Sequence, residues 1–176
     1  IKGHVGYYCG GMNQKANIYI EGNAGTGLGE NMMSGTIHVK GNASQSAGAT
    51  AHGGTIIIDG DASSRCGISM KGVDIIVKGS VGHMSAFMAQ AGTLMICGDA
   101  GDALGDSIYE TVIYLAGKPK SLGVDCIEKK ITKIDLKKIE NLIKIGNVKK
   151  LKPHNFKKFG SARKLYNFNI DNVSDY

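Results

Sequence analysis

Apolar and polar residues alternate in short segments that recur every nineteen residues over the first two thirds of the chain. Within this repeating unit the second and fourth positions are apolar, and a glycine follows at the sixth. The alternation predicts short strands with one face turned toward a core. Units begin at residues 17, 36, 55, 74, 93 and 112, and the opening IKGHVG fits the end of a further unit.

The glycine at the sixth position predicts a corner after each strand, because glycine adopts left-handed conformations at the least cost. The seventh position is mostly short and polar, as in Asn23, Asn42 and Asp61, and such side chains bond the backbone of turns. The eighth position is small and apolar. We expect these glycines to be structural turn residues: Gly3, Gly22, Gly41, Gly60, Gly79, Gly98 and Gly117.

A strand, a corner and a return segment, repeated without insertion, describe one coil of a solenoid. Each strand then pairs with its equivalent in the next coil, and each unit buries its apolar face against a copy of itself. A coil of nineteen residues is too short for helices of useful length. The sequence therefore predicts an all-β fold, a parallel β-helix of six to seven coils over residues 1–126.

Residues 127–176 lack the nineteen-residue repeat, and their sequence predicts a C-terminal cap helix and a basic, extended tail. In ITKIDLKKIENLIKIGN, Asp135 is the expected N-cap and Gly146 the expected end of a helix. Because the end of a solenoid exposes unpaired strands, we expect this helix to pack over the last coil. Its apolar stripe is Leu136, Ile139, Leu142 and Ile143.

Charge is divided unevenly between the two segments. Residues 1–117 carry 6 basic and 9 acidic side chains, whereas residues 118–176 carry 15 basic and 6 acidic ones. Aromatic residues among the tail lysines suit docking onto protein, so we expect no nucleic-acid partner. The sequence has neither an apolar run of roughly 18 residues nor a signal-peptide pattern, which predicts a cytoplasmic protein with no membrane partner. Ile1 falls within the repeat pattern, and we expect further residues upstream.

The reactive side chains form no recognisable site. Cys9, Cys66, Cys97 and Cys126 are far apart, which favours reduced thiols over a metal site. The five histidines occupy different repeat positions, and GTGLGEN lacks the third glycine of a dinucleotide-binding loop. We expect no catalytic, metal-binding or cofactor-binding residue in this chain. Turn chemistry accounts for the acidic group of Asp99, Asp102, Asp106 and Glu110.

Several longer motifs resemble one known family. GHVGYYCGGMNQ, ASQSAGATAHGG, VKGSVGHMSAFMAQAG, CGDAGDALGDSIYE and FGSARKLYNFNIDN are similar to the GXGXG domain of glutamate synthase, most closely in its stand-alone form, a subunit of glutamate synthase-like complexes. The resemblance covers nearly the whole chain. It implies a right-handed β-helix that supports the catalytic domains and carries no catalytic residue itself.

The resemblance implies a scaffold subunit that docks glutaminase (amidotransferase) and FMN-dependent synthase chains. Such a complex converts glutamine and 2-oxoglutarate to glutamate, or runs a related reaction that forms N-methylglutamate. FMN and an iron–sulfur cluster are expected on the partner subunits, with no cofactor in this chain. The candidate partner-contact residues lie in SARKLYNF: Ser161, Arg163, Tyr166 and Phe168.

Two alternatives remain open at this point. One is the scaffold C subunit of formylmethanofuran dehydrogenase, which differs in the partners recovered. The other is a β-helix acyltransferase with His52 or His83 as base, although left-handed β-helices of that kind are built from six-residue units.

Overall fold

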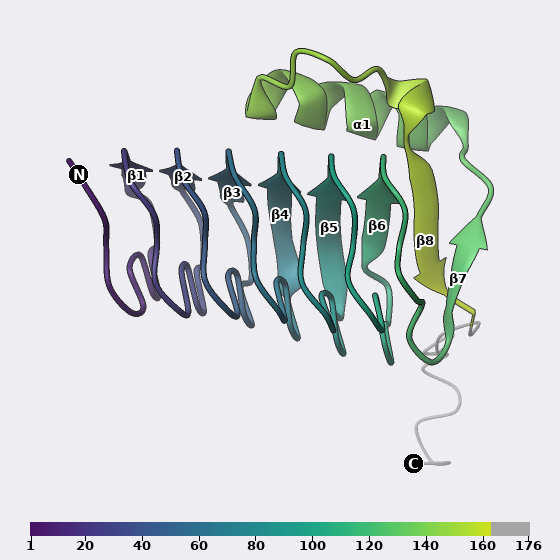
Figure 1. The fold of residues 1–176 in the computed structure, drawn as a ribbon, viewed down its shortest axis with the longest axis horizontal. Coiled ribbons are helices and arrows are strands. Elements are labelled where there is room, and N and C mark those ends of the chain that lie inside the picture. Colours follow the sequence, from purple (N-terminus) through teal and green to yellow (C-terminus); the bar gives the residue numbers. More distant parts are fainter. Residues whose placement is uncertain (163–176) are drawn as a thin grey trace, which may run out of the picture.

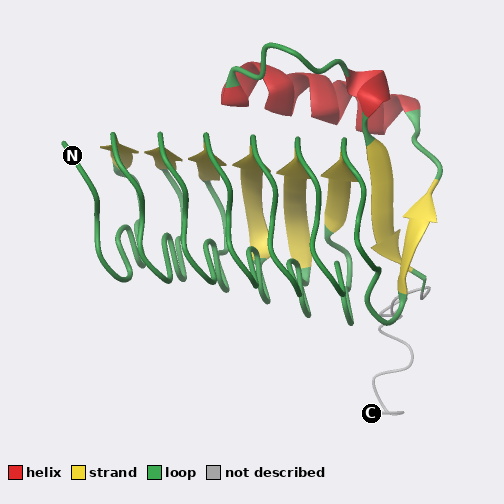
Figure 2. Ribbon diagram, in the orientation of Figure 1, coloured by secondary structure: helices red, strands yellow, loops and turns green. Residues whose placement is uncertain are grey.

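The computed structural model describes residues 1–162, a stack of coils with a helix along one side (Figures 1 and 2). The stack runs from the N-terminus to an antiparallel pair of strands near the C-terminus of the described chain. Its elements are β1 (Asn17–Ile20), β2 (Thr36–Val39), β3 (Thr55–Ile58), β4 (Lys71–Val77), β5 (Ala91–Ile96), β6 (Val112–Leu115), β7 (Cys126–Lys129), α1 (Lys133–Gly146), the 3₁₀ turn η1 (Pro153–Asn155) and β8 (Lys157–Ser161).

Each strand from β1 to β5 pairs in parallel with its equivalent one repeat later. Ile18 pairs with Ile37, and Ile37 with Ile56. The same offset holds as far as β6, except that Lys71 at the start of β4 pairs with Ala91, one residue out of register; the described residues complete about five turns between β1 and β6. Part-coils flank these turns, where Val5 bridges to Ala24 and Ala100 bridges to Pro119. The predicted parallel β-helix is confirmed.

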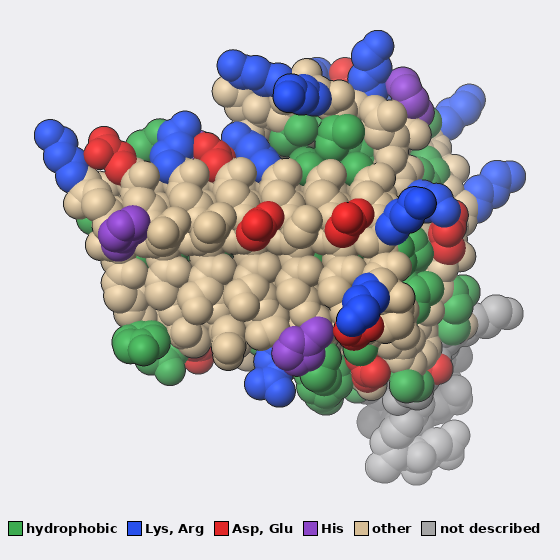
Figure 3. Space-filling model, in the orientation of Figure 1, with side chains coloured by type: hydrophobic (Ala, Val, Ile, Leu, Met, Phe, Trp, Pro, Cys, Tyr) green, Lys and Arg blue, Asp and Glu red, His purple; other side chains and the backbone are tan. Residues whose placement is uncertain are grey.

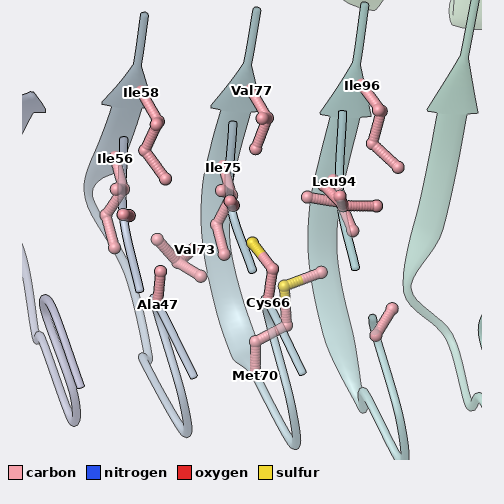
Figure 4. Close-up of a cluster of buried hydrophobic side chains, with 14 of the residues drawn as sticks. Ala47, Ile56, Ile58, Cys66, Met70, Val73, Ile75, Val77, Leu94 and Ile96 are labelled. Carbon is pink, nitrogen blue, oxygen red and sulfur yellow. The ribbon is translucent and has the colours of Figure 1, made fainter. Parts of the chain in front are cut away.

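The core consists of the second and fourth repeat positions, stacked in rows through the coils (Figure 4). Ile56 and Ile58 of β3 lie beside Ile75 and Val77 of β4, and all four are fully buried. Burial of each such side chain contributes about 1.5–3 kcal/mol. The return segments supply the opposite wall of the core with Ala47, Cys66, Met70 and Val73.

A second apolar cluster lies on the outer face of the sheet, beneath α1 (Figure 1). The third repeat position is apolar from β3 onward, and this row faces away from the core. Ile139 and Leu142 of α1 are fully buried against it. The helix therefore covers the side of the stack, and the prediction that it packs over the last coil was wrong. The row consists of Ile57, Ile76, Met95 and Tyr114.

The start of α1 differs from the sequence prediction, whereas its end does not. Thr132 is the N-cap, and Asp135 stands three residues later in a capping box: Thr132 N donates to Asp135 Oδ2 at 2.7 Å, and Asp135 N donates to Thr132 Oγ1 at 3.3 Å. At the other end the prediction is confirmed: Gly146 is the last helical residue, and Asn147 with φ 52° is the left-handed C-cap. Gly146 allows close contact with the sheet, because an added Cβ would lie 2.9 Å from Ile76 Cγ2.

The last coil is closed by a reversal of strand direction. β8 runs antiparallel to β6 and to β7, so the strand order ends β6-β8-β7. These pairings satisfy the edge that β6 would otherwise expose. β7 and β8 thus extend the sheet of the coils, and the division into domains at residues 1–126 and 127–176 stays a prediction.

Among residues 1–162, no helix is long and apolar enough to cross a membrane.

Candidate docking site on the lateral face

The repeat glycines are required by close stacking rather than by their backbone conformation. Gly3 has φ +93°, whereas the six later glycines of this row are not in the left-handed region. A Cβ added to Gly60 would lie 2.9 Å from Gly41 O and still closer to Asn42 Oδ1. The predicted conformational reason was therefore wrong for these six positions, since the space that a side chain needs is filled by the preceding coil.

The polar seventh positions form a ladder along the corner between coils. Asn23 Oδ1 accepts a hydrogen bond from Asn42 N, and Asn42 Oδ1 accepts one from Asp61 N, each at 2.8 Å. The ladder continues through Ser80 and Asp99 toward the C-terminal end. Figure 3 shows the resulting face as flat, with few large side chains. Each of these side chains accepts a hydrogen bond from the backbone of the next coil. The sequence predicted only hydrogen bonds within the same turn.

The aspartates near the last coil form hydrogen bonds and an ion pair within the stack. Asp99 Oδ1 accepts a hydrogen bond from Lys118 N at 2.8 Å, and Asp102 pairs with Lys120 Nζ at 2.8 Å. Asp106 Oδ2 accepts one from Val124 N at 3.2 Å. Within the described chain, no group of three or more His, Cys, Asp or Glu side chains is arranged to hold a metal ion.

The thiols lie apart from one another in the stack. Cys66 is fully buried, and burial raises its pKa to about 12. Burial also raises the pKa of the half-buried Cys97 to about 11, against the attraction of Lys78 for the thiolate. Each of these cysteines is a free thiol. At neutral pH both are protonated, and a protonated thiol is a poor nucleophile.

The predicted partner-contact residues are mostly beyond the described chain. Arg163, Tyr166 and Phe168 lie outside residues 1–162. Ser161 ends β8, where it pairs with Cys126 of β7, and it is 4% exposed. Its burial does not favour direct contact with a partner, and the contact role of this group stays a prediction.

The outer face of the sheet, which carries the third repeat positions and is called the lateral face here, has a half covered by α1 and a bare half. α1 lies over the strands nearest the C-terminal end of the stack, and β1 and β2 are left without a covering element among the described residues (Figure 1). On this bare half the third repeat positions are Tyr19 and His38, whose rings meet edge to face at 5.1 Å. Aromatic residues of this kind are common in protein interfaces.

A charged cluster centred on Asp59 borders this aromatic pair. His38 Nε2 and Lys78 Nζ lie 2.8 and 2.7 Å from Asp59 Oδ1, and Lys40 Nζ lies 3.3 Å from Oδ2. Burial opposes ionisation of Asp59, but the hydrogen bonds from Lys78 and His38 outweigh it and lower its pKa. Lys40 also lies 5.6 Å from the centre of the Tyr19 ring. These bonds fix a set of cations on the bare half.

A second cluster fastens α1 to the stack. Asp135 Oδ1 accepts a hydrogen bond from Tyr114 Oη at 2.7 Å and pairs with Lys158 Nζ at 2.8 Å. Burial opposes ionisation of Asp135, yet Lys158, Thr132 and Tyr114 together hold its pKa well below the ordinary value. One carboxylate thus joins α1 to β6 and β8.

A cavity of 350 Å³ opens where α1 ends. The loop after the helix and the ends of β4 and β5 enclose it. The sequence predicted that the tail lysines dock onto protein and that Cys97 is one of four reduced thiols, and it did not bring these residues together. Its lining residues are Lys78, Cys97, Asn147, Val148, Lys149, Lys150 and Leu151.

The described surface therefore offers sites for contact with other chains. The bare half of the lateral face, the Asp59 cluster and the cavity form one strip, because Lys78 both pairs with Asp59 and lines the cavity. The strip is held by ion pairs and rigid strands, which lowers the entropy lost when a partner binds.

Comparison with known proteins gives one informative relative. No known family profile matches the sequence, and no solved structure is significantly similar to it. Protein GlxC of Rhizobium meliloti (strain 1021) is 61% identical over 176 residues, which is all of this chain and 77% of that protein. Identity at this level over the full chain shows common descent and the same fold. The chain belongs to the GlxC family.

Proposed function

We propose that this protein is a non-catalytic scaffold subunit of a glutamate synthase-type complex. Its task is to hold separate amidotransferase and FMN-dependent synthase chains in fixed relative positions. The complex converts glutamine and 2-oxoglutarate to glutamate, or carries out a related reaction that forms N-methylglutamate. FMN and an iron–sulfur cluster belong to the partner chains in this proposal.

The observation that carries the proposal is the regular register of the coil stack, which shifts only at the start of β4 among the described parallel strands. Equivalent residues pair from β1 to β6 without an inserted loop, so the surface positions of one coil are fixed relative to the next. A rigid rod of this kind presents preorganised faces to several partners at once. The proposed identity of the complex rests on the resemblance of the sequence motifs to glutamate synthase, since a fold alone does not specify a function.

Membership of the GlxC family is consistent with the proposal but does not identify the reaction that the complex catalyses. The polar ladder uses the seventh repeat position and the strip the third and fifth, and in this proposal the two rows contact different chains.

Native purification of the full-length protein from its own cells tests the proposal. We expect a flavin-bearing synthase chain and a glutaminase chain to co-purify, identified by mass spectrometry and by flavin absorbance. Recovery of formylmethanofuran dehydrogenase chains would instead identify the alternative scaffold role. Recovery of the protein alone and colourless, under conditions that preserve other complexes, would contradict both.

A further inference from the structure

The cavity at the C-terminal end of α1 combines an apolar floor with a cationic rim. Val148 and Leu151 of the floor belong to the outer apolar cluster, together with the half-buried Cys97. The rim carries Lys149 and Lys150, both exposed. We propose that this cavity binds a glutamate or aspartate side chain flanked by apolar residues, on a segment of a partner chain; the identity of that chain as a subunit of the complex rests on the proposed function.

Charge determines the class of group that the cavity accepts. Lys149 and Lys150 form no ion pair with any of residues 1–162. Lys78 is engaged by Asp59, and its side chain adds to the positive wall. Among the described lining residues none is acidic. A carboxylate entering the cavity therefore meets Lys149 and Lys150, which have no ion-pair partner among residues 1–162.

The exposed charged donors at the rim of the cavity are the ammonium groups of Lys149 and Lys150. Asn147 N and Val148 N already donate to the carbonyls of Lys144 and Ile143, which closes the end of α1. The negative end of the helix dipole also lies here and disfavours an anion unless cations offset it. Lys149 and Lys150 supply this compensation, so loss of their charge is expected to weaken binding and reversal of it to abolish binding.

The surroundings favour a polypeptide over a free small anion or a nucleic acid. From the cavity, side-chain contacts lead from Lys78 to Asp59 and on to His38 beside Tyr19, so the contact strip is longer than a small molecule. Its apolar floor accommodates side chains next to the acidic residue. Single-stranded nucleic acid is held by stacking on exposed aromatic rings beside the cations, and the lining of this cavity contains no aromatic residue among the described ones.

Titration of the full-length protein with a synthetic peptide tests the inference without any partner chain. The probe is acetyl-Ser-Leu-Glu-Leu-Ser-amide, and its matched control has glutamine in place of glutamate. We expect the backbone amide NMR signals of Cys97, Val148, Lys149 and Leu151 to shift with a dissociation constant on the order of 1 mM. The glutamine peptide is expected to bind about fivefold more weakly, the effect of one partly exposed ion pair.

Variants of the protein locate the site. The pair Lys149→Glu and Lys150→Glu is expected to abolish the shifts, and Lys149→Gln with Lys150→Gln to weaken binding several-fold without reversing charge. Lys133→Glu with Lys137→Glu makes the same charge change at the exposed other end of α1 and is expected to leave binding within about twofold.

Three results would overturn the inference: no shift of these amides at millimolar peptide, equal binding of the glutamine peptide, or equal loss in the Lys133 and Lys137 control. The outcome is separate from that of the native purification, because the peptide binds or fails to bind whichever complex the protein joins.

Discussion

Tyr114 Oη donates a hydrogen bond of 2.7 Å to Asp135 Oδ1, and this bond joins the last parallel strand of the stack to the first turn of α1. The two residues are 21 positions apart, and both are buried. Lys158 of β8 reaches the same oxygen at 2.8 Å. The strand, the helix and the closing strand therefore share one buried carboxylate, and loss of any member is expected to loosen the outer apolar cluster.

Replacing Tyr114 with phenylalanine is expected to lower the free energy of unfolding by about 1–2 kcal/mol, because a buried carboxylate loses one hydrogen-bond donor and keeps Lys158 and Thr132. Urea denaturation followed by circular dichroism measures the change. Tyr7→Phe is the matched control, since Tyr7 is 77% exposed. An equal effect of the two substitutions would show that the Tyr114 bond contributes nothing.

Asp135→Asn is expected to cost about 2–3 kcal/mol at neutral pH, with a defined pH dependence. The folded-state pKa of Asp135 is depressed, so its stabilisation is present above the unfolded value of about 3.9 and is lost as the pH falls through the folded pKa. The advantage of the wild-type protein over Asp135→Asn should therefore be constant at pH 6–7 and shrink below about pH 4. Urea titrations at several pH values measure this difference. A difference that is unchanged down to pH 3 would contradict an ionised, paired Asp135.

Gly60→Ala is expected to destabilise the stack by about 1–3 kcal/mol, because the new methyl group meets Gly41 O and Asn42 Oδ1 of the preceding coil. Gly6→Ala is the control, since an added Cβ at Gly6 has no described atom within 4 Å. Thermal unfolding of the two variants measures the comparison. Similar losses in the two variants would contradict stacking distance as the reason for the glycine row.

The periodic part of the fold was predictable because each coil repeats the same pattern of apolar positions and glycine. The alternation at Ile56 and Ile58 recurs at Ile75 and Val77, and this recurrence identifies both the strand and its neighbour. The same repetition misled the explanation of the glycines. An invariant glycine is compatible with a left-handed backbone and with close stacking, and sequence alone does not separate the two.

The position of α1 was harder to predict, because a helix on the last coil and a helix along the stack use the same apolar stripe. A signal was nevertheless present in the third repeat position. It changes from Tyr19 and His38 in the first coils to Ile57 and Ile76 in the next, and an apolar outer row needs a cover. The cavity could not be predicted, since Cys97 and Lys149 are distant in sequence and meet through the end of the helix.

Thiol reactivity provides a test of the packing. Cys66 is fully buried with a raised pKa, so we expect it to resist iodoacetamide in the folded protein and to react on unfolding. Cys9 is partly exposed and is expected to react first. Peptide mapping by mass spectrometry after timed labelling gives both rates. Rapid labelling of Cys66 under native conditions would contradict a closed core at that coil.

The central claim is that this chain holds two other chains together, and removal of the chain tests it most directly. Affinity purification of the synthase chain would be carried out from cells that carry or lack this protein, with the flavin content of the synthase measured in both. We predict that the amidotransferase chain is recovered with the synthase when this protein is present and is lost in its absence, while the synthase retains its flavin. Equal recovery of the amidotransferase in the two strains would contradict the scaffold role.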